Sequence, residues 1–173
     1  LLEQLARGRC PFLGCEELYK QFRLDQPWDS PHNRGLLPLL PAVYQSPQRF
    51  DEQTNYVVPR GSGTAFPGRR GVTVRKVEDG VANTVVLLEV DDERAVPWTR
   101  PSEYRVNYAK QADGMGELRT GQFFAVWGDG TVGQIPLGMA AQCWKAMLSI
   151  DGGEPFSASQ ISKAPVTEPS PPQ

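Results

Sequence analysis

The sequence predicts an α+β protein in which a small, mostly antiparallel sheet of short strands is accompanied by a few short helices. The 173-residue chain contains 17 glycines and 16 prolines, well above ordinary usage, and this favours a loop-rich protein over one built from long helices. It also contains one strongly apolar strand, one hairpin signal and one amphipathic stretch. We expect a single domain over residues 1–154, followed by a tail.

The first helix is expected within residues 13–22. Glu16 and Glu17 open this stretch, where acidic side chains suit the start of a helix. Leu18 and Phe22 lie four residues apart, the spacing of one helical face. The sequence therefore predicts a short helix here.

A proline-rich corner follows this helix. Pro27 and Pro31 are expected to prevent regular structure around them. Ser30 or Asn33 is then expected to cap a brief helical turn through residues 36–37, which the next two prolines end.

The strands of the sheet come next. TNYVV at residues 54–58 is a short β-rich run, and a glycine- and proline-rich loop follows it to residue 71. TVVLLEV at residues 84–90 is apolar and β-branched almost throughout, as a central strand covered on both faces should be. Asp79-Gly80 supplies the turn before it.

A hairpin and a closing helix complete the predicted domain. QFFAVW and TVGQI flank Gly128-Asp129-Gly130, an Asp-Gly turn signal that predicts a hairpin. Apolar residues then recur at helical spacing, which predicts an amphipathic helix over the sheet. These residues are Leu137, Ala140, Ala141, Trp144 and Leu148. Residues 155–173 are rich in Ser and Pro, so we expect a disordered or extended tail.

The charge balance disfavours two classes of partner. Eighteen Lys and Arg against twenty Asp and Glu give a net charge of −2, and neither sign forms a long block. We therefore expect no nucleic-acid partner and no binding to a membrane surface. No apolar run of about 18 residues and no basic-then-apolar leader occurs, so we expect no membrane span in the chain as given. It begins at Leu1 rather than Met, so an upstream leader and helix could have been removed.

Three cysteines, Cys10, Cys15 and Cys143, leave at least one thiol outside any intrachain disulfide. None of their spacings is the CxxC of zinc or redox sites. A Cys10–Cys15 disulfide remains an alternative to the favoured interpretation, in which the three pack as small apolar side chains in or near the core.

The only histidine, His32, lies in DQPWDSPHN and is the first candidate for chemistry. A single histidine excludes a multi-histidine zinc centre, and no G-x-S-x-G elbow presents a nucleophile for a triad. Asp29, Ser30 and Asn33 are residues that bond their own backbone in turns. We therefore favour a shaped corner, anchored to the core by Trp28, over a reactive site.

Two further groups are weak candidates for ligands. The glycine- and arginine-rich loop 61–71 lacks the G-x-x-x-x-G-K-[ST] pattern, so a surface loop is favoured over a phosphate cradle. Asp79, Asn83 and Asp129 are the side chains that would suit Ca²⁺, together with the acidic run from Glu89 to Glu93. No D-x-[DN]-x-[DN]-G loop is present, so solvated turns without a cofactor are favoured.

Seven stretches occur in order along the chain: PFLGCEELYKQF, DQPWDSPHN, TNYVV, GTAFPG, VEDGVANTVVLLEV, AVPWTRP and FFAVWGDGTVGQI. Together they resemble the bacterial prepilin-like family labelled domain of unknown function 1559, which is also grouped with solute-binding proteins. The resemblance covers residues 11–154 and rests on the co-occurrence of the stretches, because each alone is unspecific.

The resemblance implies a pseudopilin-type protein of the cell envelope, with an N-terminal leader and apolar helix followed by an extracytoplasmic α+β head of pilin-like character. Its C-terminal, prepilin-processing-associated module carries a motif of His, nine residues, then Asp-Gly. Asp129-Gly130 match the motif, and Arg119 stands at the position of the histidine. The chain as given lacks the leader and the helix, so we expect it to correspond to the head, as a fragment or a diverged member.

We therefore expect a non-enzymatic, extracytoplasmic prepilin-like protein whose head contacts pilus-like or envelope proteins or a surface ligand. One alternative is a binding module for a small solute or glycan, with Trp28, Trp98, Trp127 and His32 as candidate contacts. The other is a hydrolase that uses two carboxylates in a concave pocket. Exposure of the tryptophans tests the binding-module hypothesis, because such a module needs at least two of them in an exposed cleft.

Overall fold

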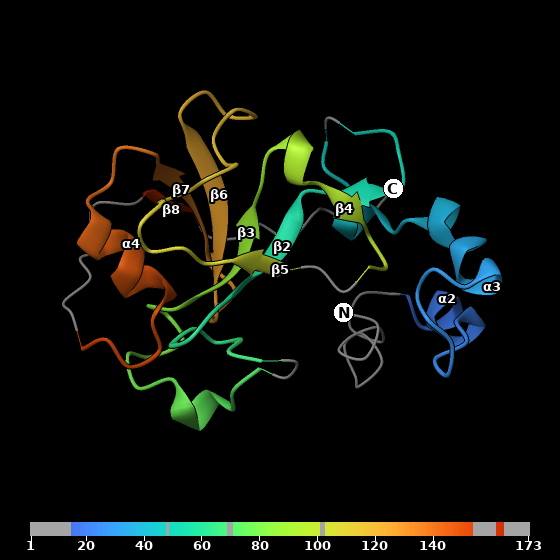
Figure 1. Ribbon diagram of the computed structural model, residues 1–173, viewed down its shortest axis with the longest axis horizontal. Coiled ribbons are helices and arrows are strands. Elements are labelled where there is room, and N and C mark those ends of the chain that lie inside the picture. Colours follow the sequence, from blue (N-terminus) through green and yellow to red (C-terminus); the bar gives the residue numbers. More distant parts are fainter. Residues whose placement is uncertain (1–14, 48, 69–70, 101–102, 154–161, 165–173) are drawn as a thin grey trace, which may run out of the picture. The chain divides into compact units, whose positions relative to one another are not determined.

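The computed structural model describes residues 15–47, 49–68, 71–100, 103–153 and 162–164. The chain, expected to form one domain over residues 1–154, divides into two compact units (Figure 1). The first unit comprises Leu1–Tyr56 and Arg94–Ser102, and the second comprises Val57–Glu93 and Glu103–Gln173. The predicted α+β class is confirmed. Among the described residues, no helix is long and apolar enough to cross a membrane.

The first unit consists mainly of short helical segments. Its elements are α2 (Glu16–Gln21), α3 (Pro31–Arg34), η2 (Leu37–Leu39), η3 (Ala42–Tyr44), β1 (Gln53–Thr54) and β4 (Val96–Pro97). β1 and β4 pair antiparallel, with Gln53 opposite Pro97. This pairing explains why a segment from later in the chain belongs to the N-terminal unit.

The first predicted helix of this unit is present as α2, but the turn expected through residues 36–37 is not formed as predicted. The turn that Ser30 caps, α3, ends at Arg34, and a separate 3₁₀ turn, η2, follows at Leu37–Leu39 and includes Pro38, which is tolerated in a first turn. In α2, Lys20 Nζ lies 2.7 Å from Glu17 Oε1, an i,i+3 ion pair on an exposed face. In α3, Ser30 is the cap, because its Oγ accepts a 3.3 Å hydrogen bond from the Asn33 amide. Pro31, which was expected to prevent regular structure, instead begins the helix. The first helical position needs no N–H donor, so proline is tolerated there.

Trp98 forms the core of the first unit and is only 2% exposed. Its ring packs edge-on against Phe22 at a centroid distance of 5.7 Å and stacks on Tyr44 at 5.9 Å. Its indole Nε1 donates a 2.9 Å hydrogen bond to Leu37 O, which satisfies the polar end of the buried ring. The segment after β4 is thereby fixed to the helical turns.

The second unit is built on one sheet with strand order β5-β2-β3-β6-β7-β8 (Figure 1). The β3–β6, β6–β7 and β7–β8 pairs are antiparallel, and the β2–β5 pair is parallel. The strands are β2 (Tyr56–Arg60), β3 (Val85–Glu89), β5 (Glu103–Arg105), β6 (Gln122–Trp127), β7 (Val132–Pro136) and β8 (Ser162–Ala164). The helical segments are η4 (Val74–Lys76), η5 (Asp92–Arg94) and α4 (Ala141–Leu148).

The central strand and the hairpin agree with their predictions. β3 lies between β2 and β6, and its residues Val85 and Leu88 are fully buried. The hairpin of β6 and β7 turns at the predicted Asp-Gly, where Gly130 has a φ of +88° that glycine adopts without strain. Backbone hydrogen bonds of 2.9 Å, from Gly130 N to Trp127 O and from Trp127 N to Thr131 O, close the turn.

The closing helix begins later than its apolar pattern predicts. Leu137 is 39% exposed and lies before α4, which begins at Ala141. Pro136 and Gly138 both disfavour helix, so the backbone enters α4 only after them. Trp144 of α4 is then buried, with its ring 6.0 Å from the Phe123 ring of β6.

The expectation of a disordered or extended tail over residues 155–173 holds only in part. Ser162–Ala164 form β8, which pairs antiparallel with β7. The edge of β7 offers backbone donors and acceptors that an extended segment can satisfy, even where its composition carries no strand signal. The other residues of this range lie outside the described part of the chain.

Two of the three cysteines are described. Cys15 precedes α2 and Cys143 lies in α4, and both are half-buried. This agrees with packing near the core. Cys10 lies outside the described residues, and the Cys10–Cys15 disulfide with it.

Trp144 offers a test of the core of the second unit. Because the side chain is 1% exposed and packs edge-on against Tyr104 and Phe123, Trp144→Ala should lower the free energy of unfolding by about 3–5 kcal/mol. Urea denaturation followed by circular dichroism measures this change. Gln142→Ala, on the exposed side of the same helix, should change the free energy of unfolding by no more than about 0.5 kcal/mol. Equal losses in the two variants would contradict this packing.

Candidate functional site

The carboxylate of Glu89 is buried at the end of the central strand, with 2% exposure. Arg119 binds it in a bidentate manner, with Nε 3.1 Å from Oε2 and Nη2 2.9 Å from Oε1. The run from Glu89 to Glu93 was expected to be a solvated turn, and this expectation is wrong for Glu89 and Asp91. A buried carboxylate needs a charged partner and hydrogen bonds, and Arg119 supplies both.

Arg119 also ties this ion pair to β6. Its guanidinium carbon lies 4.6 Å from the centroid of the Phe124 ring, a cation–π arrangement. The Phe124 amide donates a 3.3 Å hydrogen bond to Glu89 Oε2. With its side chain 24% exposed, Arg119 is a partly covered group that connects two neighbouring strands.

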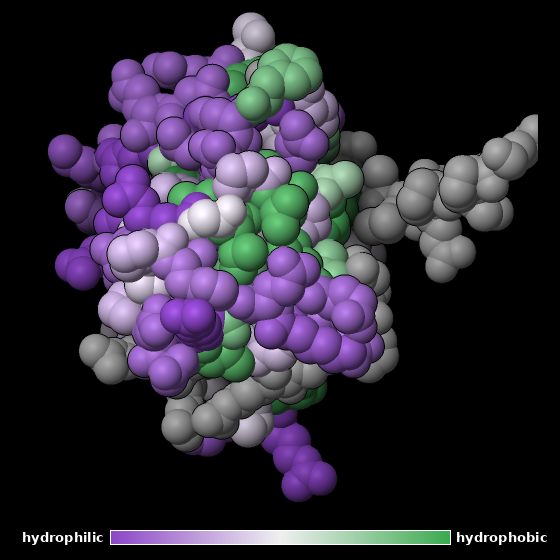
Figure 2. Space-filling model, turned by 90° about the vertical axis from the view of Figure 1, so that its right-hand side faces the viewer, coloured by the Kyte–Doolittle hydropathy of each residue, from purple (hydrophilic) through white to green (hydrophobic). Residues whose placement is uncertain are grey.

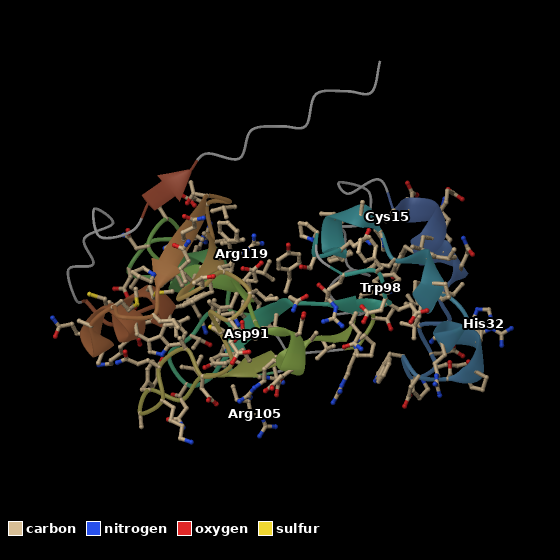
Figure 3. All side chains as sticks on the ribbon, turned by 90° about the horizontal axis from the view of Figure 1, so that it is seen from above. Cys15, His32, Asp91, Trp98, Arg105 and Arg119 are labelled. Atoms are coloured by element: carbon tan, nitrogen blue, oxygen red, sulfur yellow. The ribbon has the colours of Figure 1, made fainter. Side chains whose placement is uncertain are left out.

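Asp91 holds the chain segment that carries Arg119, which we name the 107–121 loop. Asp91 is 4% exposed, and its Oδ1 accepts hydrogen bonds from the amides of Glu117 (2.8 Å) and Leu118 (3.2 Å). The Asp91 amide donates to Gly114 O at 2.9 Å. Two buried carboxylates, two residues apart, therefore fix this loop to the end of β3. Asp91 and Arg119 are labelled in Figure 3.

The backbone of the 107–121 loop is strained at two positions. Ala112 and Thr120 have φ values of +48° and +52°, in the left-handed region that non-glycine residues rarely adopt. Each costs on the order of 1–3 kcal/mol and persists only where the surroundings hold it. Gly116 has a φ of +95°, which glycine adopts without strain, and a Cβ there would also lie 2.6 Å from Cδ1 of the partly exposed Leu137 side chain. The loop is held in one conformation by its contacts.

Tyr108 is a partly covered polar group of the same loop, with 39% exposure. Burial raises the pKa of its phenol above the ordinary value of 10.0, and the negative charge of Asp151 raises this pKa further. The phenol is therefore neutral near pH 7 and can act as a hydrogen-bond donor.

The weak calcium candidates all have backbone partners. Both carboxylate oxygens of Asp79 accept amide hydrogen bonds, from Gly152 at 2.8 Å and from Gly153 at 3.0 Å. Asn83 Nδ2 donates to Asp79 O at 2.8 Å. Asp129 Oδ1 accepts from the amide and the hydroxyl of Thr131, at 3.0 and 2.7 Å. In the described ranges, no three His, Cys, Asp or Glu side chains are grouped so that they could hold a metal ion.

These candidates do lie at one end of the sheet. The Gly128 amide, next to Asp129, donates to Thr84 O at 2.9 Å. Thr84 Oγ1 donates to Ser149 O at 3.2 Å. The two Asp-Gly turns and the segment after α4 therefore meet at the start of β3, opposite the end that carries Glu89. Their hydrogen bonds describe a structural junction.

The DQPWDSPHN stretch forms a corner of the first unit, as favoured above. Asn33 is fully buried, and its side chain both accepts from Arg23 N and donates to Arg23 O, at 3.0 Å in each case. It also donates to Pro27 O at 2.8 Å. His32 is exposed, and its Nε2 lies 2.8 Å from Gln21 O at the end of α2. Asn33, rather than His32, is the residue on which this corner depends.

The tryptophan candidates are not presented as an aromatic surface. Trp98 and Trp127 are buried in the cores of separate units, with 2% and 0% exposure. Trp28 is half-buried in the corner of the first unit. The solute- or glycan-binding interpretation needed at least two of these rings exposed in one cleft, and burial removes Trp98 and Trp127 from that role.

The loop after β2 uses its polar groups internally. Thr64 is fully buried, and its hydroxyl donates to Gly61 O at 2.9 Å and to Pro59 O at 3.2 Å. Gly63 O accepts from the Ile150 amide at 2.8 Å. This agrees with a structural loop rather than a phosphate cradle. Residues 69–70 lie outside the described part of the chain.

Sequence reasoning did not predict that Glu89 and Asp91 are buried. A signal was present, because Glu89 follows four apolar residues of a strand expected to be covered on both faces. An acidic residue inside such a strand predicts a buried charge with a partner. The partner itself, 30 residues later in the chain, had no local signal.

The chain was compared with protein-family models, curated proteins and solved structures, and none of them matches it.

Removing one member of the Glu89–Arg119 pair should lower the free energy of unfolding markedly. Arg119→Met leaves the Glu89 carboxylate buried without its partner, which should lower the free energy of unfolding by about 3–5 kcal/mol. The double variant Glu89→Gln/Arg119→Met should recover a large part of this loss, because no buried charge remains. Urea denaturation of both variants measures the difference. Arg105→Met, at a side chain 88% exposed, is the matched control and should stay within about 0.5 kcal/mol. A double variant no more stable than Arg119→Met would rule out this account.

Replacing Asn33 should lower the free energy of unfolding more than replacing the neighbouring His32. Asn33→Ala leaves the Arg23 amide and carbonyl without their buried partner and should cost roughly 1–3 kcal/mol per group. His32→Ala removes one exposed contact and should cost about 0.5–1.5 kcal/mol. Denaturation followed by tryptophan fluorescence compares the two variants. A larger loss of unfolding free energy in His32→Ala than in Asn33→Ala would show that the corner depends on His32 instead.

Proposed function

We propose that this protein is a non-enzymatic, prepilin-like protein of the cell envelope, and that its second unit makes protein contacts through the 107–121 loop. The proposal takes its family from the order of the seven sequence stretches. Its physical support comes from the way the second unit uses the motif positions and from the ordered loop beside them.

The observation that carries the proposal is the place of the motif positions on β6. Arg119 precedes this strand and binds Glu89 at the end of β3. Asp129-Gly130 follow it, next to Gly128, which bonds to Thr84 just before β3. The nine residues between the two parts of the motif therefore include the whole of β6. Arg119 contacts one end of β3, and Gly128, which adjoins the Asp-Gly part, bonds to Thr84 before the other end. Such a motif frames a strand pair, which suits a structural head.

The charged groups beside the motif also favour a structural role. The Glu89 carboxylate is occupied by Arg119 and the Phe124 amide, and the Asp91 carboxylate by two loop amides. Carboxylates that serve as general acids or bases need access to a reacting group. Here their hydrogen bonds are directed to the protein itself.

The 107–121 loop has the properties of a contact surface. Its side chains at Tyr108, Lys110, Asp113 and Glu117 are exposed, while Asp91 and Arg119 fix its backbone. A loop held in its bound conformation loses little conformational entropy on association, and this favours binding. Loops on a rigid sheet are also common positions for recognition residues.

Site-specific photo-cross-linking in the cells that produce the protein tests this proposal. A cross-linking amino acid at Lys110 or Glu117 should give adducts with envelope proteins, and these adducts should fractionate with the envelope. The same amino acid at Gln142, exposed on α4, is the control and should give few adducts. Recovery of the chain in the cytosol, or equal adducts at all three positions, would reject the proposal.

A further inference from the structure

The β7 edge of the sheet is occupied by a segment from the C-terminal tail. β8 lies antiparallel to β7, with Val132 opposite Ala164, Gly133 opposite Lys163 and Gln134 opposite Ser162. Residues 154–161 connect the end of the preceding segment to this strand. The occupant of the β7 edge is thus a short extended segment that lies outside the β6–β7 hairpin.

Prolines limit how far this ladder can extend. Pro165 immediately follows Ala164, at one end of the ladder, and Pro136 lies two residues past Gln134, beyond the other end. Proline has no amide donor and so cannot extend the pairing of a strand. Three residue pairs provide few backbone hydrogen bonds, so the ladder opens at a low free-energy cost compared with the core strands.

The outer strands of the sheet are β5 and β8, and β7 becomes an edge only when β8 leaves it. The edge that β7 would then present differs from the β5 edge in its protection. At the other edge, β5 carries Glu103, which forms an ion pair with Arg60, and Arg105, which is 88% exposed. Charged side chains on an edge strand discourage pairing with another chain. The paired residues of β7 are Val132, Gly133 and Gln134, and none is charged. Once β8 leaves, the β7 edge is therefore the one that favours pairing with a strand.

We propose that the β7 edge is a strand-acceptor site that takes Ser162–Ala164 from a second copy of this chain in exchange for its own. A second copy carries the identical segment and can form the identical register, so the exchange needs no new type of contact. The inference stands independently of the proposed function. It would give a head that contacts other proteins a route to self-association.

The length of chain that joins β8 to the rest of its own molecule determines how the exchange depends on protein concentration. Because eight residues of sequence separate Gly153 from Ser162, β8 is tethered to its own chain, and a tether of this length gives an effective concentration on the order of millimolar. Pairing within one chain therefore dominates in dilute solution. Exchange between copies becomes favourable where the local protein concentration approaches the same range.

Disulfide trapping between two differently substituted chains tests the exchange. In a background with Cys10, Cys15 and Cys143 replaced by serine, one chain carries Gln134→Cys and the other Ser162→Cys. Opposite residues of an antiparallel pair have Cα atoms about 4.5–5.5 Å apart, within the range of a disulfide. Mixed at millimolar concentration and oxidised, the two chains should form a covalent dimer of twice the 19.1 kDa chain mass. Thermal melts should first establish that the background variant folds.

The control places the first cysteine at the other edge. Arg105→Cys mixed with Ser162→Cys should give no covalent dimer above the background of random oxidation. The single chain with both Gln134→Cys and Ser162→Cys should form its disulfide internally in dilute solution. Dimer yields equal to those of the Arg105→Cys control, or a bond that forms only within one chain, would overturn the exchange. Neither result would affect the cross-linking at Lys110 and Glu117, so the two proposals fail separately.

Discussion

A carboxylate buried at the end of a central strand imposes a requirement on the rest of the second unit. Glu89 is 2% exposed, and a charge removed from water is stable only with a partner and a full set of hydrogen bonds. The partner, Arg119, lies 30 residues away along the chain. The intervening segment must therefore return to the same end of β3, and it does so as the 107–121 loop. Asp91 fixes that return by accepting two of the loop's amides.

The cost of this arrangement is local strain, and its result is an ordered surface loop. Ala112 and Thr120 adopt left-handed backbone conformations that only strong surrounding contacts maintain. The opposite end of β3 is held differently, because the Asp79 carboxylate, the Thr84 hydroxyl and the Gly128 amide connect turns by hydrogen bonds to backbone groups. One end of the sheet is thus a junction of turns, and the other presents a loop held by buried charge.

Elements whose signals are local were predicted from the sequence. The β6–β7 hairpin follows from its Asp-Gly turn, β3 from its continuous apolar run, and α2 from acidic residues before an apolar spacing. Where helical periodicity and helix-breaking residues competed, the helix began later than the periodicity predicted. Periodicity placed the start of the last helix at Leu137, but the neighbouring Pro136 and Gly138 delayed it to Ala141. The corner at DQPWDSPHN was also predicted, although its key contacts come from Asn33.

The sequence by itself determined the fold class, the central strand, the hairpin and the position of Arg119 relative to Asp129-Gly130. Only the tertiary structure decided the division into two units, the burial of Glu89 and Trp98, and the pairing of β8 with β7. The physical reason is the range of the interactions. Turns and periodic patterns act between neighbours in the chain, whereas a buried charge, a core ring and a sheet edge are defined by partners that are distant in sequence.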